Sequence, residues 1–189
     1  MGQGGVVAIL DWDTHRYLEA FFAVPMLGST LHTVNIRLSP SQIAYTVDHA
    51  EDDVILFHAD FIPLLEEVML EVKRDARLIV MRDSPDNELP QTTLKIEAIF
   101  DELFINTDQY FSFPDFDENT RATTFYTTGT TGNPKAVAYS HRQLVLHTMG
   151  ILATFGPMSA NNRFHNRDVY MPITPMFHVH GWGFPYAAT

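Results

Sequence analysis

The stretch from Ala122 to Ser140, ATTFYTTGTTGNPKAVAYS, places two short apolar runs on either side of a loop of threonine and glycine. β-Branched and aromatic residues favour strands in both runs. The loop between them, Thr127 to Lys135, suits a polyphosphate: glycines let backbone N–H groups approach, hydroxyls donate hydrogen bonds, and lysine neutralises charge. The stretch predicts strand, phosphate-binding loop and strand, with these candidate ligand-binding residues: Thr127, Thr128, Gly129, Thr130, Thr131, Gly132 and Lys135.

The spacing of this loop differs from that of a Walker A loop. Two residues instead of four separate Gly129 from Gly132, no Gly-Lys pair occurs, and a strand is expected after the loop instead of a helix. A glycine-containing β-turn whose threonines merely favour strands is the alternative, and for an isolated Gly-Thr-Thr-Gly it would be the better interpretation.

Upstream of this loop, residues 1–110 alternate between short apolar runs and amphipathic segments, the pattern typical of βαβ units and a parallel sheet. Expected strands are Val6–Leu10, Leu31–Val34, Asp53–His58 and Leu78–Met81. Expected helices are one capped by Asp13 and ending at Pro25, one from Ser39 to about Ala50, one over 61–72, and a short one near Leu94–Leu103.

Residues 106–121 are predicted to form an acidic linker, after which the pattern changes. Ser140 and Gln143 form a capping box that opens a further helix. A polar loop, Gly156–Arg167, and a short strand, Val169–Pro172, are expected next. We therefore divide the chain into a βαβ segment, 1–110, and a segment that contains the phosphate loop, 122–189, to which the resemblance described below assigns an acyl pocket.

The composition excludes several classes of protein. At 189 residues and 46% hydrophobic, the chain has the size and apolar content of one α/β domain. A net charge of −11 argues against a nucleic-acid partner. No apolar run reaches the ~20 residues of a transmembrane helix, and no secretory signal is recognisable. A cytoplasmic location is the default expectation, with peripheral membrane association as an alternative.

Residues Tyr126 to Lys135, YTTGTTGNPK, closely resemble the phosphate-loop signature of the AMP-binding, or adenylate-forming, superfamily. Pro172 to Gly183, PITPMFHVHGWG, resembles the family's next motif, which enters the acyl-substrate pocket. Residues 10–57 look like the first βαβ segment of the medium- and long-chain fatty-acyl-CoA synthetase branch. The resemblance covers nearly the whole chain and weakens over 82–121 and 156–167.

This resemblance implies an ATP-dependent ligase of fatty-acid metabolism. Members join ATP, with Mg²⁺, to a carboxylic acid as an acyl-adenylate and then pass the acyl group to coenzyme A. By motif position, Thr127 would help hold Mg²⁺, and the other loop residues named above would hold the β- and γ-phosphates. His178 would be the catalytic residue beside the reacting carboxylate, Val179 would line the substrate site, and Trp182 would border the acyl channel.

Plainer interpretations of the second motif remain open. Phe177–Trp182 is also compatible with an aromatic core segment in which Trp182 is fixed. His178 and His180 make a poor zinc site without further ligands. Ala136 stands where the family usually has glycine, and its methyl group is expected to restrict the backbone there without abolishing binding.

The resemblance also implies parts that these residues do not supply: a later Thr-Glu segment, a ribose-binding aspartate, a hinge and a C-terminal domain with a catalytic lysine. We therefore expect the incomplete N-terminal portion of the acyl-CoA synthetase fold, without ligase turnover by itself. An adenylate-forming ligase for an aryl or amino acid and a non-catalytic interaction or dimerisation module are the alternatives. A homodimer is a further expectation from resemblance.

Overall fold

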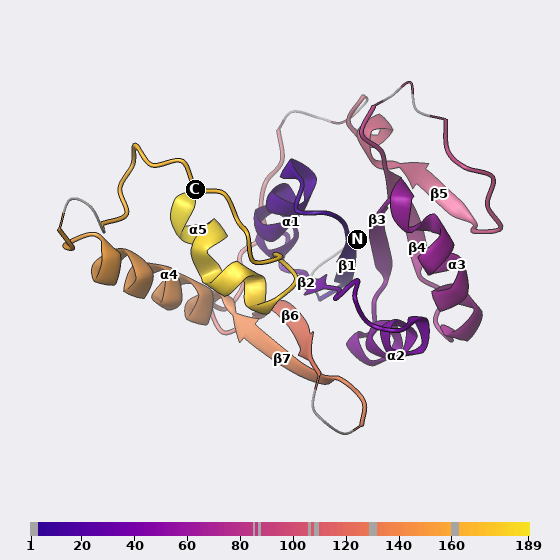
Figure 1. Cartoon of the computed structure of the whole chain (residues 1–189), viewed down its shortest axis with the longest axis horizontal. Helices are drawn as coiled ribbons and strands as arrows, with labels where there is room; N and C mark the ends of the chain where they lie inside the picture. The colour runs from indigo at the N-terminus through magenta and orange to yellow at the C-terminus, as the bar shows by residue number, and fades with distance from the viewer. Residues whose placement is uncertain are drawn as a thin grey trace.

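One seven-stranded sheet organises the protein (Figure 1). The computed structural model describes residues 4–84, 86, 88–105, 107, 110–128, 132–159 and 163–189. In the order β5-β4-β3-β1-β2-β6-β7, all neighbours are parallel except β6 and β7, which are antiparallel. The strands are β1 (Val6–Leu10), β2 (Thr30–Thr33), β3 (Val54–His58), β4 (Arg77–Met81), β5 (Ile96–Ile99), β6 (Arg121–Thr127) and β7 (Lys135–Ser140). The expected mostly parallel α/β sheet is confirmed.

Helices cover both faces of this sheet. The α-helices are α1 (His15–Met26), α2 (Pro40–Ala50), α3 (Ile62–Glu71), α4 (His141–Phe155) and α5 (Phe184–Ala188). Short 3-10 helices span η1 (Ala59–Phe61), η2 (Phe100–Phe104) and η3 (Val179–Gly183). Because side chains alternate along a strand, Val7 and Ile9 pack toward α1, while Ala8 and Leu10 pack toward α2 and α3. Figure 1 shows α1 on the opposite side of the sheet from α2 and α3.

Local capping signals set the starts of two helices, as predicted. The Ser39 hydroxyl accepts a hydrogen bond from the Gln42 backbone N–H, and the Gln42 side chain accepts one from the Ser39 N–H. Pro40, which has no N–H to donate, occupies the first helical position of α2. Ser140 and Gln143 repeat the capping box at the start of α4.

Three local predictions were wrong. The expected helix over Leu94–Leu103 is instead β5 followed by η2, because pairing with β4 and partial burial of Ile96 and Ile99 against the core outweigh local helix preference. No strand forms at Val169–Pro172 in the described residues; Val169 is 96% exposed and has no strand beside it. Thr14 precedes α1 in place of the expected cap, Asp13, whose carboxylate accepts a hydrogen bond from Met176 instead.

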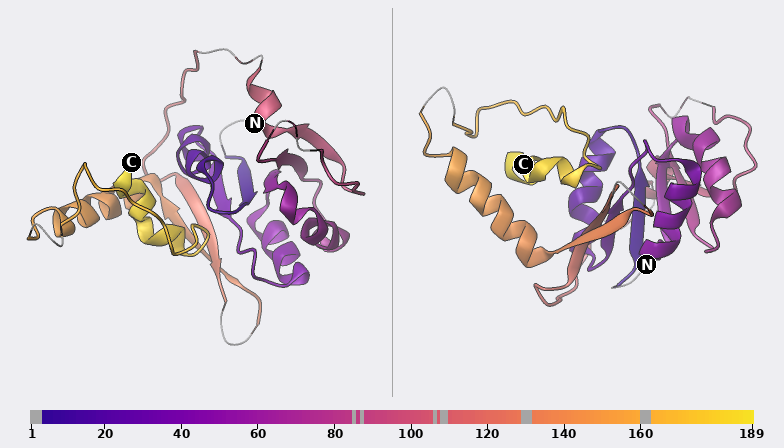
Figure 2. Two further views of the ribbon diagram at one scale, coloured as in Figure 1. Left: turned by 45° about the horizontal axis from the view of Figure 1, so that its top comes forward. Right: turned by 60° about the horizontal axis from the view of Figure 1, so that its bottom comes forward.

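The long helix α4 extends away from the β7 edge of the sheet. Figure 2 shows α5 beside it, between α4 and α1, and Tyr186 of α5 packs against Phe21 and Phe22 of α1. Between α1, α4 and Tyr186 of α5 lies an apolar cavity of about 290 Å³. Across the described part of the chain, no helix has the length and apolar character needed to cross a membrane.

Candidate functional site

The predicted phosphate loop connects the two antiparallel strands at the edge of the sheet. Thr127 pairs with Lys135 across the base of the loop, and both residues are exposed. Thr128 is exposed beside them, and Gly132 has a φ of +95°, a conformation that favours glycine. Gly129, Thr130 and Thr131 lie outside the described residues. The strand–loop–strand arrangement is confirmed, and it differs from the strand–loop–helix of a Walker A site.

Polar and aromatic contacts of Tyr126 anchor the strand that enters this loop. The Tyr126 hydroxyl lies 2.8 Å from Nδ1 of His49 on α2, and its ring lies 5.0 Å from that of His32 on β2. Burial, followed by the charge of Asp52, raises the pKa of Tyr126, so the phenol stays protonated. Sequence reasoning did not identify this anchor. The histidine inside the buried strand TLHT was the available signal.

His32 is itself held by a buried carboxylate. Its Nδ1 lies 2.8 Å from Oδ2 of Asp52, and both side chains are almost fully buried. Burial raises the pKa of Asp52, while the adjacent His32 charge and hydrogen bond oppose that rise. The base of the phosphate loop therefore rests on two polar pairs, Asp52 with His32 and Tyr126 with His49, which meet through the ring contact between His32 and Tyr126.

The second motif crosses the carboxyl ends of β1 and β2. The Met176 N–H donates to Oδ1 of Asp13 at 2.8 Å, just after β1. The Phe177 carbonyl lies 3.5 Å from the Thr33 hydroxyl, and the Arg37 guanidinium lies 5.8 Å above the Phe177 ring. These contacts fix the backbone immediately before His178.

The structure brings His178 and Trp182 together. Their ring centroids are 6.2 Å apart in an edge-to-face arrangement, and both side chains are exposed, Trp182 by 57%. Val179, which follows His178 in the sequence, is half-buried, and His180 is buried. Trp182 is therefore not a fixed core residue within the described structure. No group of three His, Cys, Asp or Glu side chains in the described ranges forms a metal site.

His180 links the second motif to the hairpin of the phosphate loop. Its ring lies 4.9 Å from Phe125 on β6 and 6.0 Å from Tyr139 on β7. Among the described residues, no hydrogen bond or ring contact joins Thr127 or Lys135 directly to His178 or Trp182. The phosphate loop and the pair His178 and Trp182 are thus connected indirectly, through the contacts of His180 with strands β6 and β7.

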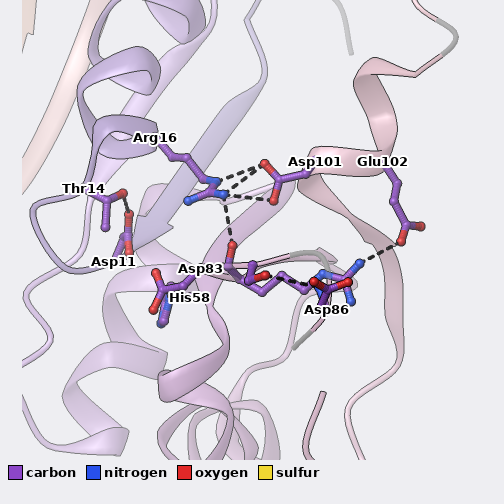
Figure 3. A network of polar contacts seen from close by, with 10 residues as sticks. Asp11, Thr14, Arg16, His58, Asp83, Asp86, Asp101 and Glu102 are labelled. Atoms are coloured by element: carbon purple, nitrogen blue, oxygen red, sulfur yellow. Dashed lines mark hydrogen bonds and ion pairs between the residues drawn. The ribbon is translucent and has the colours of Figure 1, made fainter. Parts of the chain in front are cut away.

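A separate polar network lies at the carboxyl ends of β1, β3 and β4 (Figure 3). Asp11, only 2% exposed, accepts a hydrogen bond from the Thr14 hydroxyl, and among the described residues its Oδ1 has no hydrogen-bond partner. Burial raises the pKa of Asp11 to about 6, although Thr14 and the nearby charges of His58 and Arg16 oppose the rise. Arg16 donates to Asp101 and to the Arg82 carbonyl. The network joins α1 to the far half of the sheet.

The chemistry of the hairpin fits a nucleotide triphosphate. Thr127, Thr128 and Lys135 present two hydroxyls and a cation at one exposed end of a strongly acidic protein. Mg²⁺ is commonly held by one or two protein oxygens together with substrate phosphates and water. Such an ion would be held by phosphate oxygens and water, with a threonine hydroxyl of this loop as one ligand.

Comparisons with known proteins identify the family of the chain. The whole chain, residues 1–189, matches the family described as "AMP-binding enzyme". It is 42% identical to the 3-methylmercaptopropionyl-CoA ligase of Ruegeria pomeroyi over 96% of this chain. It is also 42% identical to the long-chain-fatty-acid–CoA ligase of Thermus thermophilus over the full chain. The chain spans 32% of the length of each of these relatives.

A solved structure shows the same fold. The acyl-CoA synthetase of Brucella canis superposes with a TM-score of 0.74 at 19% identity, covering 100% of this chain and 31% of that one. At this identity the likeness supports the architecture of the sheet and its helices.

Proposed function

The chain belongs to the family of AMP-binding enzymes, and from that premise we propose that the whole protein is a fatty-acid–CoA ligase. It would form an acyl-adenylate from a fatty acid and ATP, releasing pyrophosphate, and then transfer the acyl group to coenzyme A. The observation that carries the proposal is the exposed pairing of Thr127 with Lys135 at the end of an anchored hairpin.

Charge control is the main chemical task of such a site. A carboxylate attacks the α-phosphate, so two anionic groups must approach each other, and fixed donors lower the cost of that approach. Bound Mg²⁺ supplies further charge neutralisation at the phosphates. In the proposed roles, Thr127 contributes to the Mg²⁺ site and Lys135 neutralises the β- and γ-phosphates. The remaining phosphate donors would be Thr128, Gly129, Thr130, Thr131 and Gly132.

The exposed pair of aromatic rings would form the acyl side of the site. We assign His178 to the reacting carboxylate, as a hydrogen-bond donor that orients it, and Val179 to the wall of the substrate site. Trp182 would border the acyl channel. Its indole is large and apolar, and its exposure leaves it free to contact an acyl chain.

The identity of the acid needs a direct test, because the chain is equally identical to a relative named for a long-chain acid and to one named for a small thioether acid. We expect the whole protein to convert fatty acids to acyl-CoA thioesters when given ATP, Mg²⁺ and coenzyme A. Mass spectrometry of products from short, medium and long fatty acids, 3-methylmercaptopropionate, aryl acids and amino acids would check this. Thioesters only from aryl or amino acids would replace the fatty-acid assignment.

An interaction or dimerisation module is the second candidate, favoured by the exposed apolar side chains of α4. Val145, Leu146, Met149 and Leu152 are all exposed, and Val145 and Met149 also line the apolar cavity beside α1. The two candidates differ in what they require of Lys135. A module of this kind would not need its ammonium group.

A further inference from the structure

The turn that carries His178 and Trp182 has an unusual backbone. Val179, His180, Gly181 and Trp182 have φ values of 49°, 53°, 57° and 61°, and Gly183 follows at 76°. Steric clashes make this left-handed region unfavourable for residues other than glycine, and most unfavourable for a β-branched residue such as Val179. A run of such residues persists only where surrounding contacts hold it.

His180 holds this turn from the inside. Its side chain is 2% exposed and lies edge-to-face against Phe125 of β6 at 4.9 Å and Phe21 of α1 at 5.8 Å. Burial lowers the pKa of His180 to about 3, which agrees with a neutral ring packed as an aromatic group. This ring fixes the turn against both α1 and the phosphate-loop hairpin.

His147 holds the same turn from α4. Its Nε2 donates to the Trp182 carbonyl at 3.1 Å. A Cβ atom on the next residue, Gly183, would lie only 2.5 Å from Cδ2 of His147, so the imidazole occupies the space that a side chain would need. The backbone of Trp182 is therefore clamped between α4 and the sheet, while its indole stays exposed.

We propose that His147 and His180 are positioning residues that orient His178 and Trp182 for the acid substrate. The left-handed turn sends His180 inward and leaves His178 and Trp182 exposed with their rings 6.2 Å apart. His147 and His180 act through this turn and need no contact with the substrate. The kinetic part of the proposal rests on the function proposed above, whereas the structural part does not.

Fluorescence of the full 189-residue chain tests the structural part without any activity. The chain has two tryptophans, so Trp12→Phe leaves Trp182 as its single reporter. In that background, His147→Ala should raise acrylamide quenching of Trp182 roughly twofold and lower its anisotropy, because a local clamp is lost. His147→Gln, whose amide can donate to the same carbonyl, should restore both values. Leu146→Ala, a neighbouring exposed position on α4, should change neither.

Kinetics of the whole protein test the positioning role. His147→Ala and His180→Ala should lower kcat for acid-dependent adenylation on the order of 10- to 100-fold, because small misplacements near reacting groups are costly. KM for MgATP should stay unchanged, since the phosphate loop is untouched. His147→Gln and His180→Phe should recover most of the rate, and circular dichroism would establish that each variant folds.

The outcomes distinguish failure of the proposed ligase function from failure of the proposed positioning role. An inactive wild-type protein would overturn the proposed function, while the quenching data would still decide the role of His147. If folded His147→Ala shows the same acrylamide quenching of Trp182 as the chain that retains His147, the proposed clamp is overturned. An active protein whose His147→Ala and His180→Ala variants match Leu146→Ala in kcat would overturn the positioning role.

Discussion

Replacing Lys135 by alanine should reduce kcat/KM for MgATP in the whole protein on the order of 100-fold, the scale seen when one preorganised charge-stabilising donor is removed. Lys135 is the first residue of β7, exposed at the end of the hairpin opposite Thr127. With a net charge of −11, the protein repels nucleotide at long range, so a local cation is needed to hold the triphosphate.

Lys135→Arg and Lys95→Ala provide the comparison for this experiment. Arginine keeps the charge and should retain much of the rate, although its fork has a different geometry from an ammonium group. Lys95 is also exposed, next to β5 at the opposite edge of the sheet, so its loss should leave MgATP kinetics unchanged. Activity unaltered by Lys135→Ala would contradict the role assigned to Lys135, whereas a wild-type protein inactive with every acid would favour the non-catalytic module.

Asp11→Asn should stabilise the chain at pH 8 by about 1–2 kcal/mol, an uncommon direction for a change at a buried site. A pKa raised from 3.8 to about 6 corresponds to at most about 3 kcal/mol of destabilisation when the carboxylate is charged. The asparagine amide takes the place of an oxygen that has no hydrogen-bond partner in the described part of the chain, and its unpaired N–H offsets part of the gain.

The pH dependence gives this prediction its sign. Between pH 3.8 and about 6 the folded chain keeps a proton on Asp11 that the unfolded chain releases, so stability falls as pH rises through this window. The advantage of Asp11→Asn should therefore be absent near pH 4 and fully present above pH 6. Urea unfolding at several pH values would measure it.

Asp75→Asn is the matched control, because it removes the same charge from an exposed position. It should change stability little at any pH. Equal destabilisation by Asp11→Asn at pH 4 and pH 8 would contradict the account and assign the Asp11 carboxylate a structural hydrogen-bonding role instead.

Short-range signals made most of the fold predictable from the sequence. The capping boxes at Ser39 and Ser140 act within one turn of chain and were found where expected. The buried strands β1 and β3 carry unbroken apolar runs that need no partner to be recognised. The phosphate loop was recognisable because its hydroxyls, glycines and lysine are contiguous.

The structural features that the sequence did not predict depend on long-range contacts. Ile96 to Ile99 became a strand because β4 offered an unpaired parallel edge. His32 and Asp52 are 20 residues apart, and nothing local indicates their buried pairing. The left-handed turn after His178 depends on α1, α4, β6 and β7 together, so the inward direction of His180 had no signature in its own motif.

The central claim is that the whole protein forms an acyl-adenylate, and ATP–pyrophosphate exchange tests it most directly because coenzyme A is not needed for that step. The account predicts exchange that requires both Mg²⁺ and a carboxylic acid, with a fatty acid as the most effective one. Absence of exchange with every acid, or exchange that proceeds equally without any acid, would contradict it.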